Sequence, residues 1–208
     1  MTPTVSVDGL LAGYRQADEQ QHRVAEATVR CIGTWGIAKT SLDDIARAAG
    51  MSRATLYRVA PGGKERLIAA VVCFEVGRCF ARIDDELAAA GDLADVLTRG
   101  ITTSMRMVTT HPVIKALVEH EPDRILPHFA FDQLGRSLAV TSELARPHLA
   151  RHLPEDAIAP AAEWAARIVL TYSINPSASV DPHDPESVRR LVATYVMPAL
   201  ARLQEAAP

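Results

Sequence analysis

The sequence of 208 residues predicts an all-α protein. Apolar residues recur at helical spacing in several long segments, and no segment shows the alternation of period two that is typical of a strand. Aromatic residues make up only 5% of the chain, whereas alanine and leucine abound, and this composition favours helices over β-sheet. Glycines and prolines punctuate the helical segments, and roughly nine helices are expected between them.

The first 17 residues contain Pro3, Gly9 and Gly13 and are predicted to form a flexible N-terminal arm. A helix is expected from Asp18, because apolar residues then follow helical spacing. Glycines at 33 and 36 should end it. Its apolar stripe consists of Val24, Ala27, Cys31, Ile32 and Trp35.

The following segment predicts two short helices joined by a tight turn. The Thr-Ser pair at 40–41 can cap the first helix, with an aspartate from 43–44 as the carboxylate of a capping box. Gly50 supplies the left-handed conformation that ends this helix, and Ser52 caps the second helix, Arg53–Val59. Two helices connected in this way are typical of a helix-turn-helix.

The rest of the chain continues the helical pattern. A long helix should begin at about Gly63 and continue into the 80s, and the run AAAGD at 88–92 should end it. Prolines separate the later segments. Helices are expected there at about residues 92–110, 112–120, 131–152, 156–173 and 185–205.

Charge is distributed unevenly along the chain. Residues 39–66 hold 6 basic and 3 acidic side chains, whereas residues 81–208 hold 12 and 17. A basic segment attached to an acidic body is compatible with nucleic-acid binding through one end, although a chance fluctuation of charge would look the same.

The compartment follows from three observations. The N-terminus lacks the basic and apolar pattern of a signal peptide, and no stretch approaches the ~20 apolar residues of a membrane-spanning helix. Cys31, Cys73 and Cys79 are an odd number without a disulfide framework, and we expect them to be reduced and buried. The sequence therefore predicts a cytoplasmic protein with no membrane partner.

The second helix of the motif carries side chains suited to a DNA groove, where its N-terminal residues would face base edges. Arg53 can pair with a guanine or a phosphate, and Ala54 allows close approach or touches a thymine methyl group. Thr55 can bond a base or a phosphate, while Tyr57 and Arg58 lie on the next turn, near the flanking phosphates. Periodicity alone is equally compatible with a helical hairpin that bears surface arginines.

The run from residue 25 to 70, AEATVRCIGTWGIAKTSLDDIARAAGMSRATLYRVAPGGKERLIAA, closely resembles the N-terminal DNA-binding domain of tetracycline-repressor-like (TetR/AcrR) transcriptional regulators. Its most specific part is TSLDDIARAAGMSRATLYR, with the Lys-Glu that opens the next helix. The resemblance implies an arm at 1–17, a three-helix DNA-binding domain at 18–62, and a helical effector-binding and dimerisation domain at 63–208. The operator contacts that it implies are Ser41, Ser52, Arg53, Thr55, Tyr57 and Lys64.

The chain departs from the family pattern directly after the second helix. Many members carry His-Phe where this chain has Val59 and Ala60, so a phosphate-binding histidine and a core-filling phenylalanine are both absent. An extra glycine precedes Lys64 and puts the register of the operator contacts in question. Lys64 itself lies at a helix N-terminus, where the helix dipole disfavours a positive charge. The same dipole and the Lys64 ammonium group would both favour binding of a DNA phosphate.

The resemblance also implies a homodimer built from the last two helices. Apolar residues at helical spacing can support such an interface, although an intramolecular core explains the same stripes equally well. The candidate interface residues are Trp164, Ile168, Val188, Leu191, Val192, Tyr195 and Val196.

A small-molecule effector pocket among the middle helices is the family expectation. Methionine and aromatic side chains could line an apolar cavity, with arginine or histidine as polar anchors, but the same side chains suit an ordinary core. The candidates are Arg78, Met105, Met107, His111, His120, Phe129, Phe131 and Trp164.

Metal binding and catalysis find little support. His148 and His152 have the spacing of a zinc pair, but Pro147 disturbs their helix, and we expect the histidines of this region to be solvated. No GxSxG, Walker or GxGxxG motif occurs, so we expect neither an enzyme nor a cofactor. The predicted function is a one-component transcriptional regulator, a repressor of a pseudo-palindromic operator. The alternative is a small-molecule binding protein or an orphan regulator controlled by protein contacts.

Overall fold

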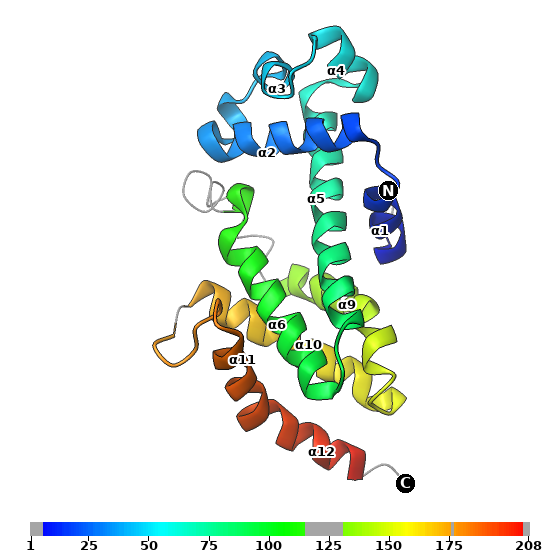
Figure 1. Ribbon diagram of the computed structural model, residues 1–208, viewed down its shortest axis with the longest axis vertical. Helices are drawn as coiled ribbons and strands as arrows, with labels where there is room; N and C mark the ends of the chain where they lie inside the picture. Colours follow the sequence, from blue (N-terminus) through cyan, green and yellow to red (C-terminus); the bar gives the residue numbers. More distant parts are fainter. Residues whose placement is uncertain (1–5, 115–130, 176, 206–208) are drawn as a thin grey trace. The chain divides into compact units, whose positions relative to one another are not determined.

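The computed structural model describes the backbone of residues 6–114, 131–175 and 177–205, and the side chains of 6–114, 139–175 and 177–202. Within these ranges the regular secondary structure is helical, with no strand (Figure 1), which confirms the predicted fold class. The helices are α1 (Val7–Arg15), α2 (Glu19–Lys39), α3 (Leu42–Ala48), α4 (Arg53–Val59), α5 (Gly63–Ala88), α6 (Leu93–Thr110), α9 (Phe131–Leu149), α10 (Glu155–Ile174), α11 (Pro185–Leu191) and α12 (Met197–Glu205), with a π-helical turn, Val192–Val196, between the last two.

The chain forms two compact units. Unit 1 comprises residues 1–81 and 110–130, and unit 2 comprises residues 82–109 and 131–208. The boundary predicted from the sequence lies at 62/63, before α5. The structure assigns the first part of α5 to unit 1 because Leu67 and Val71 of α5 are buried in the core that α2, α3 and α4 share.

Within the segment 1–17, predicted as a flexible arm, the chain forms the helix α1. Ser6 caps this helix by accepting a hydrogen bond from the backbone N–H of Gly9, at 3.2 Å, and Val7 is buried. The helix lies against α5 at Gly77, where a Cβ atom would come within 2.4 Å of the Leu10 carbonyl oxygen. Tertiary packing thus outweighs the low helix propensity of the glycines in α1.

The core of unit 1 joins α2 to the two short helices. Ile45 of α3 is completely buried and Leu56 of α4 is 1% exposed, and both contact the apolar side of α2. Gly36 interrupts α2 with a φ of +77°, so the predicted break occurs, but the helix resumes to Lys39. Since helices of seven residues are unstable alone, this shared core holds α3 and α4 in place.

Unit 2 is built around α6, α10 and the C-terminal helices. Met105 of α6 and Val188 of α11 are fully buried in its core, and Asp184 caps α11 by accepting hydrogen bonds from the N–H groups of Glu186 and Ser187. None of the helices in the described residues is long and apolar enough to cross a membrane.

Candidate nucleic-acid interface

Side-chain caps define the N-terminal ends of α3 and α4. The Ser41 hydroxyl accepts from the Asp44 N–H, and the Asp44 carboxylate accepts from the Ser41 N–H, each at 3.2 Å. The hydrogen bond from the Ser41 hydroxyl is the main cause that lowers the pKa of Asp44. Gly50 has a φ of +65°, and the Ser52 hydroxyl accepts from the Thr55 N–H at 3.1 Å. The predicted helix boundaries are therefore confirmed.

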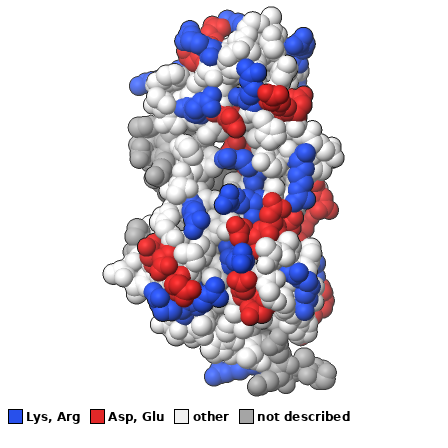
Figure 2. Space-filling view, in the orientation of Figure 1, with Lys and Arg blue, Asp and Glu red and all other residues white. Residues whose placement is uncertain are grey.

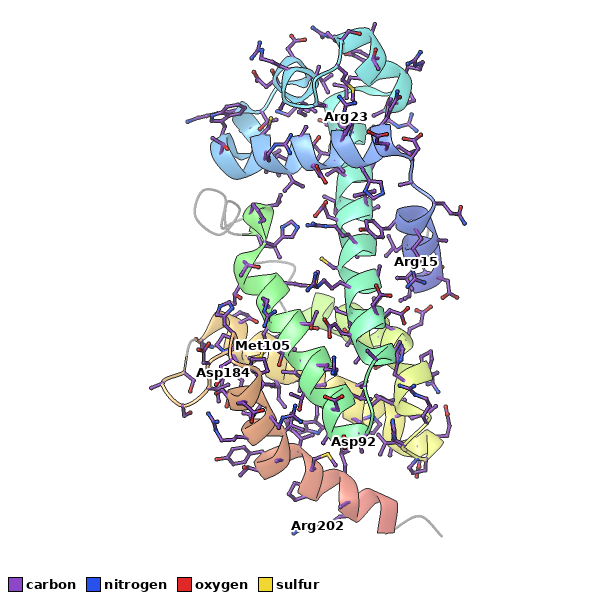
Figure 3. All side chains as sticks on the ribbon, viewed as in Figure 1. Arg15, Arg23, Asp92, Met105, Asp184 and Arg202 are labelled. Atoms are coloured by element: carbon purple, nitrogen blue, oxygen red, sulfur yellow. The ribbon has the colours of Figure 1, made fainter. Side chains whose placement is uncertain are left out.

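Two arginines of α2 hold the end of α3, and the sequence analysis missed both. The guanidinium of Arg23, labelled in Figure 3, donates to the carbonyl oxygens of Ala49, at 2.7 Å, and Gly50, at 3.4 Å. Arg30 donates to the Ala48 carbonyl at 3.0 Å. Positive groups at a helix C-terminus satisfy carbonyls that lack helical partners, so these contacts fix the angle at which α4 leaves the turn.

The predicted contact residues of α4 share its outer side. Arg53, Ala54, Tyr57 and Arg58 are exposed, whereas Leu56 points into the core. Ser41 and Ser52, the two cap residues, are exposed as well, and the Thr55 side chain is half-buried. The helix-turn-helix thus leaves the predicted residues of α4, apart from the half-buried Thr55, exposed to solvent.

Arg53 is held by neighbours in the free protein. Its guanidinium lies 3.1 Å from the Asp43 carboxylate and 5.7 Å from the centroid of the Tyr57 ring. Asp43, which the sequence analysis did not include among the contact residues, therefore competes with any anion that Arg53 would bind. Figure 2 shows that acidic side chains lie among the basic ones at this end of unit 1.

Lys64 has a partner within the chain. Its ammonium group donates to the Ala38 carbonyl at 3.2 Å, near the C-terminus of α2. The turn before it depends on Gly62 and Gly63, with φ angles of +110° and +83°. Other residues adopt such angles only with strain, so the second glycine serves the turn that positions Lys64.

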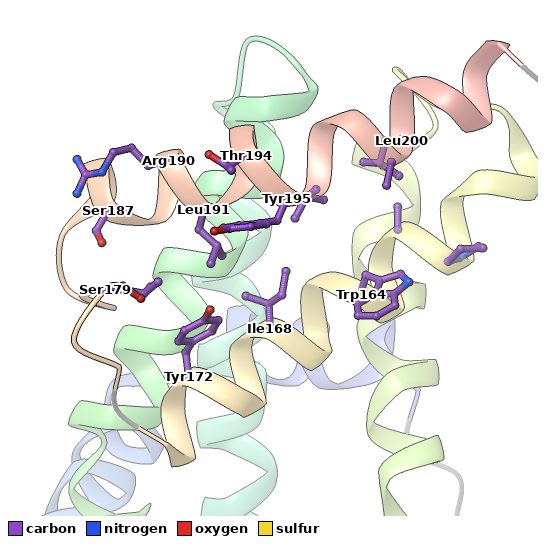
Figure 4. A pocket seen from close by; sticks show the side chains of 15 residues that line it. Trp164, Ile168, Tyr172, Ser179, Ser187, Arg190, Leu191, Thr194, Tyr195 and Leu200 are labelled. Carbon is purple, nitrogen blue, oxygen red and sulfur yellow. The ribbon is translucent and has the colours of Figure 1, made fainter.

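In unit 2, α10 and the C-terminal helices border a cavity of about 660 Å³ (Figure 4). Trp164 and Tyr195 line it and are 64% and 75% exposed, which is unusual for large aromatic side chains. Four of the seven predicted interface residues are buried in the core of unit 2: Val188, Leu191, Val192 and Val196. The π-helical turn at 192–196 shifts the helical phase, which simple 3.6-residue periodicity could not anticipate.

The predicted effector residues whose side chains the structure describes are divided between the two units. Met105 is fully buried in the core of unit 2, Met107 is half-buried, and Trp164 is exposed on α10. Arg78 and His111 belong to unit 1. His120 and Phe129 lie outside the described residues, as does the side chain of Phe131.

Arg78 and His111 instead meet at a glutamate that the sequence analysis missed. One carboxylate oxygen of Glu75 lies 2.5 Å from the Arg78 guanidinium and 2.9 Å from Nε2 of His111. The side chains of Glu75 and His111 are each only 10% exposed, so the expectation of a solvated histidine was wrong here. Burial raises the pKa of Glu75, but the contacts with His111 and Arg78 outweigh it and leave that pKa below its ordinary value.

We expect His111→Leu to make unit 1 sensitive to acid. A carboxyl group with a lowered pKa stabilises the fold above its unfolded-state pKa and loses this contribution as the pH falls through the folded-state value. Without His111 the pKa of Glu75 rises, so unfolding should begin at higher pH, with a loss at neutral pH of roughly 1–3 kcal/mol. Circular dichroism during acid titration measures the pH at which unfolding begins, and the loss of stability at neutral pH follows from unfolding in denaturant. The double variant Glu75→Gln/His111→Leu is the control: an equal shift in it would exclude Glu75 as the cause.

His148 also has a structural partner. Its Nε2 lies 2.8 Å from the Asp84 carboxylate, and the residue is 7% exposed, which again corrects the expectation of a solvated histidine. No group of three or more histidine, cysteine, aspartate or glutamate side chains within the described part of the chain is arranged to hold a metal ion.

The comparisons with known proteins agree with this geometry. Residues 24–71 match the family model of bacterial regulatory proteins, tetR family. An uncharacterized HTH-type transcriptional regulator of Mycobacterium tuberculosis (strain H37Rv) is 29% identical over 195 residues, which cover 93% of this chain and 91% of that protein.

Two solved structures are similar over most of their length. The TetR family repressor AlkX from Dietzia sp. strain DQ12-45-1b, implicated in biodegradation of n-alkanes, is 25% identical with a TM-score of 0.53, over 86% of this chain and 95% of that chain. The fatty acid degradation regulator FadR from Bacillus halodurans has a TM-score of 0.57 at 15% identity, over 87% of this chain and 98% of that chain. At that identity the second likeness is one of fold alone.

Proposed function

The chain belongs to the tetR family of bacterial regulatory proteins and is a transcriptional regulator, and on this premise we propose that it is a cytoplasmic repressor. It binds a pseudo-palindromic operator as a homodimer and is released by a small, largely apolar effector. The observation that carries this proposal is the exposed side of α4, where Arg53, Tyr57 and Arg58 project from a helix that α2 and α3 hold rigidly.

The chemistry of that surface suits a major groove. Ala54 leaves room for close approach, and the arginines can bond base edges or phosphates. Lys64 can reach the phosphate backbone if it leaves the Ala38 carbonyl, because the ion pair with a phosphate is stronger than a neutral hydrogen bond. Arg53 likewise can exchange Asp43 for a base or phosphate.

Dimerisation is supported by the aromatic residues of unit 2. Trp164 and Tyr195 are more than half exposed and border an apolar cavity between α10 and the C-terminal helices. A second copy would bury both rings. One recognition helix reads only a few base pairs, whereas two on a symmetric frame read two half-sites. An effector that binds one conformation of the dimer better would shift the population away from the DNA-binding form.

A salt titration with DNA from the region upstream of the gene tests the proposal. The wild-type protein should prefer one sequence over a random competitor, and its affinity should fall steeply with salt because phosphate contacts release counterions. Lys64→Ala should weaken binding to all sequences alike and reduce the salt slope by about one. Arg202→Ala, an exposed arginine of α12, is the matched control and should leave both unchanged. A protein that shows no preference for any sequence would refute the repressor proposal.

A further inference from the structure

Unit 1 contains a cavity of about 520 Å³ beside the DNA-binding helices. Its walls come from α1, α2, α5 and the end of α4, and they are predominantly apolar, with Leu10, Val24 and Leu67 among them. Ala60, directly after α4, also lines it. Volumes of this size are typical of small-molecule sites.

The helix α1 forms one wall and is fixed in place. The close approach of Leu10 to Gly77 brings α1 against α5, and the Tyr14 ring contacts Phe74, with ring centroids 5.1 Å apart. His22 of α2 completes this aromatic group at 5.4 Å from Tyr14 and 4.9 Å from Phe74. By contrast, a Cβ atom at Gly13 would meet nothing within 4 Å. The cavity is therefore open at Gly13, where an added side chain would have room.

Among the described residues that line this cavity, Arg66 is the one with a charged side chain. No carboxylate among the described residues pairs with it. Its aliphatic part lies over Gly62, where an added Cβ atom would be 2.3 Å from the Arg66 Cδ atom. The guanidinium is thus a free cation at the edge of an apolar space, and both features together suit a molecule with an apolar chain and an anionic end.

We propose that this cavity binds a small amphipathic carboxylate, with its chain between α1 and α5 and its carboxylate on Arg66. The site differs in place from any pocket of unit 2, because the described residues that line it lie between Gly9 and Phe74. It also lies partly outside the family-matched residues 24–71, since α1 supplies a wall.

A molecule bound in this cavity would contact residues at the end of the proposed recognition helix α4. Val59, Ala60 and Pro61, which end α4 and lead to Lys64, are part of its wall. A bound molecule that draws Arg66 away from Gly62 changes the packing of the turn that positions Lys64. This consequence for DNA rests on the proposed function, whereas the binding itself does not.

Octanoate is the probe for binding to the full-length protein, and 1-octanol is its uncharged control. Cys73 lines the cavity and is exposed, while Cys31 is buried and burial raises the pKa of Cys79 to about 11, so a thiol reagent at neutral pH should modify Cys73 first. Octanoate should slow the alkylation of Cys73, and calorimetry should give its dissociation constant. Octanol should bind roughly two- to fivefold more weakly, the range expected for one exposed ion pair.

Two variants with matched controls decide the location. Gly13→Leu fills the cavity and should abolish both binding and protection, while Gly91→Leu, at another glycine with open space, should change neither. Arg66→Gln should bring octanoate to the affinity of octanol, and Arg202→Gln should not. Thermal unfolding measurements check that each variant is folded. If Gly13→Leu does not fold, Gly13→Ala takes its place. Absence of binding, or equal binding to wild type and the folded Gly13 variant, would overturn the proposal, as would equal affinity for octanol and octanoate.

Operator affinity with and without octanoate is then measured separately. A reduced affinity in the wild type but not in Gly13→Leu supports the route through the α4–α5 turn. Octanoate binding by a protein that recognises no DNA would refute the proposed function while it leaves the site intact.

Discussion

Arg53→Ala should remove sequence preference at one position of each operator half-site. If the guanidinium exchanges Asp43 for a guanine, the loss is about 1–3 kcal/mol for the preferred base and far less for the other three. Affinities for a set of operators that vary at single positions measure this. A loss of equal size for every sequence would show that Arg53 contacts a phosphate instead.

Asp43→Asn is the matched variant for this experiment. It breaks the ion pair with Arg53 at 3.1 Å without removing the guanidinium. Were Arg53 only to brace α4 through Asp43, both variants would weaken DNA binding in the same way. We expect instead that Asp43→Asn keeps the sequence preference and binds DNA slightly more tightly, because a negative charge has been removed near the phosphates.

Trp164→Glu should dissociate the proposed dimer. The indole is 64% exposed in the single chain, and loss of an aromatic residue at the centre of an interface costs about 2 kcal/mol or more, which is roughly thirtyfold in dissociation constant. Sedimentation equilibrium measures the change. Binding to the whole operator should fall with it, whereas binding to an isolated half-site should not, because α4 is untouched.

Trp35→Glu provides the control for Trp164→Glu. Trp35 is the only other tryptophan, it is 47% exposed, and it belongs to α2 in unit 1. It should leave the oligomeric state unchanged. If Trp164→Glu also remains dimeric, the partner surface lies elsewhere, and the exposed ring of Tyr195 would need a different explanation.

The helix-turn-helix could be predicted from sequence because its determinants are local. The Ser41 and Asp44 capping box, the Ser52 cap and the left-handed Gly50 each involve residues within a few positions of one another. Such contacts do not depend on the rest of the fold, so the pattern that encodes them can be read directly. The apolar stripe that includes Ile45 could be predicted for the same reason, because helical spacing alone places its residues on one side of the helix.

The amphipathic C-terminal helices could not be assigned from local sequence patterns. Periodicity assigned seven residues to a possible interface, but it could not tell which apolar residues face the core of their own chain. The structure buries Val188 and Val192 and exposes Trp164 and Tyr195. A π-helical turn decides part of this outcome, and its formation depends on packing around the helix.

By itself, the sequence determined the all-helical class, the limits of α3 and α4 and the outer residues of the recognition helix, because hydrogen bonds and periodicity within short segments specify them. Only the tertiary structure decided that α1 forms and packs at Gly77, that Lys64 meets the Ala38 carbonyl and that Glu75 joins His111 to Arg78. Each of these joins segments far apart in the chain. Their energies come from burial and from charges brought together on folding, which no local pattern records.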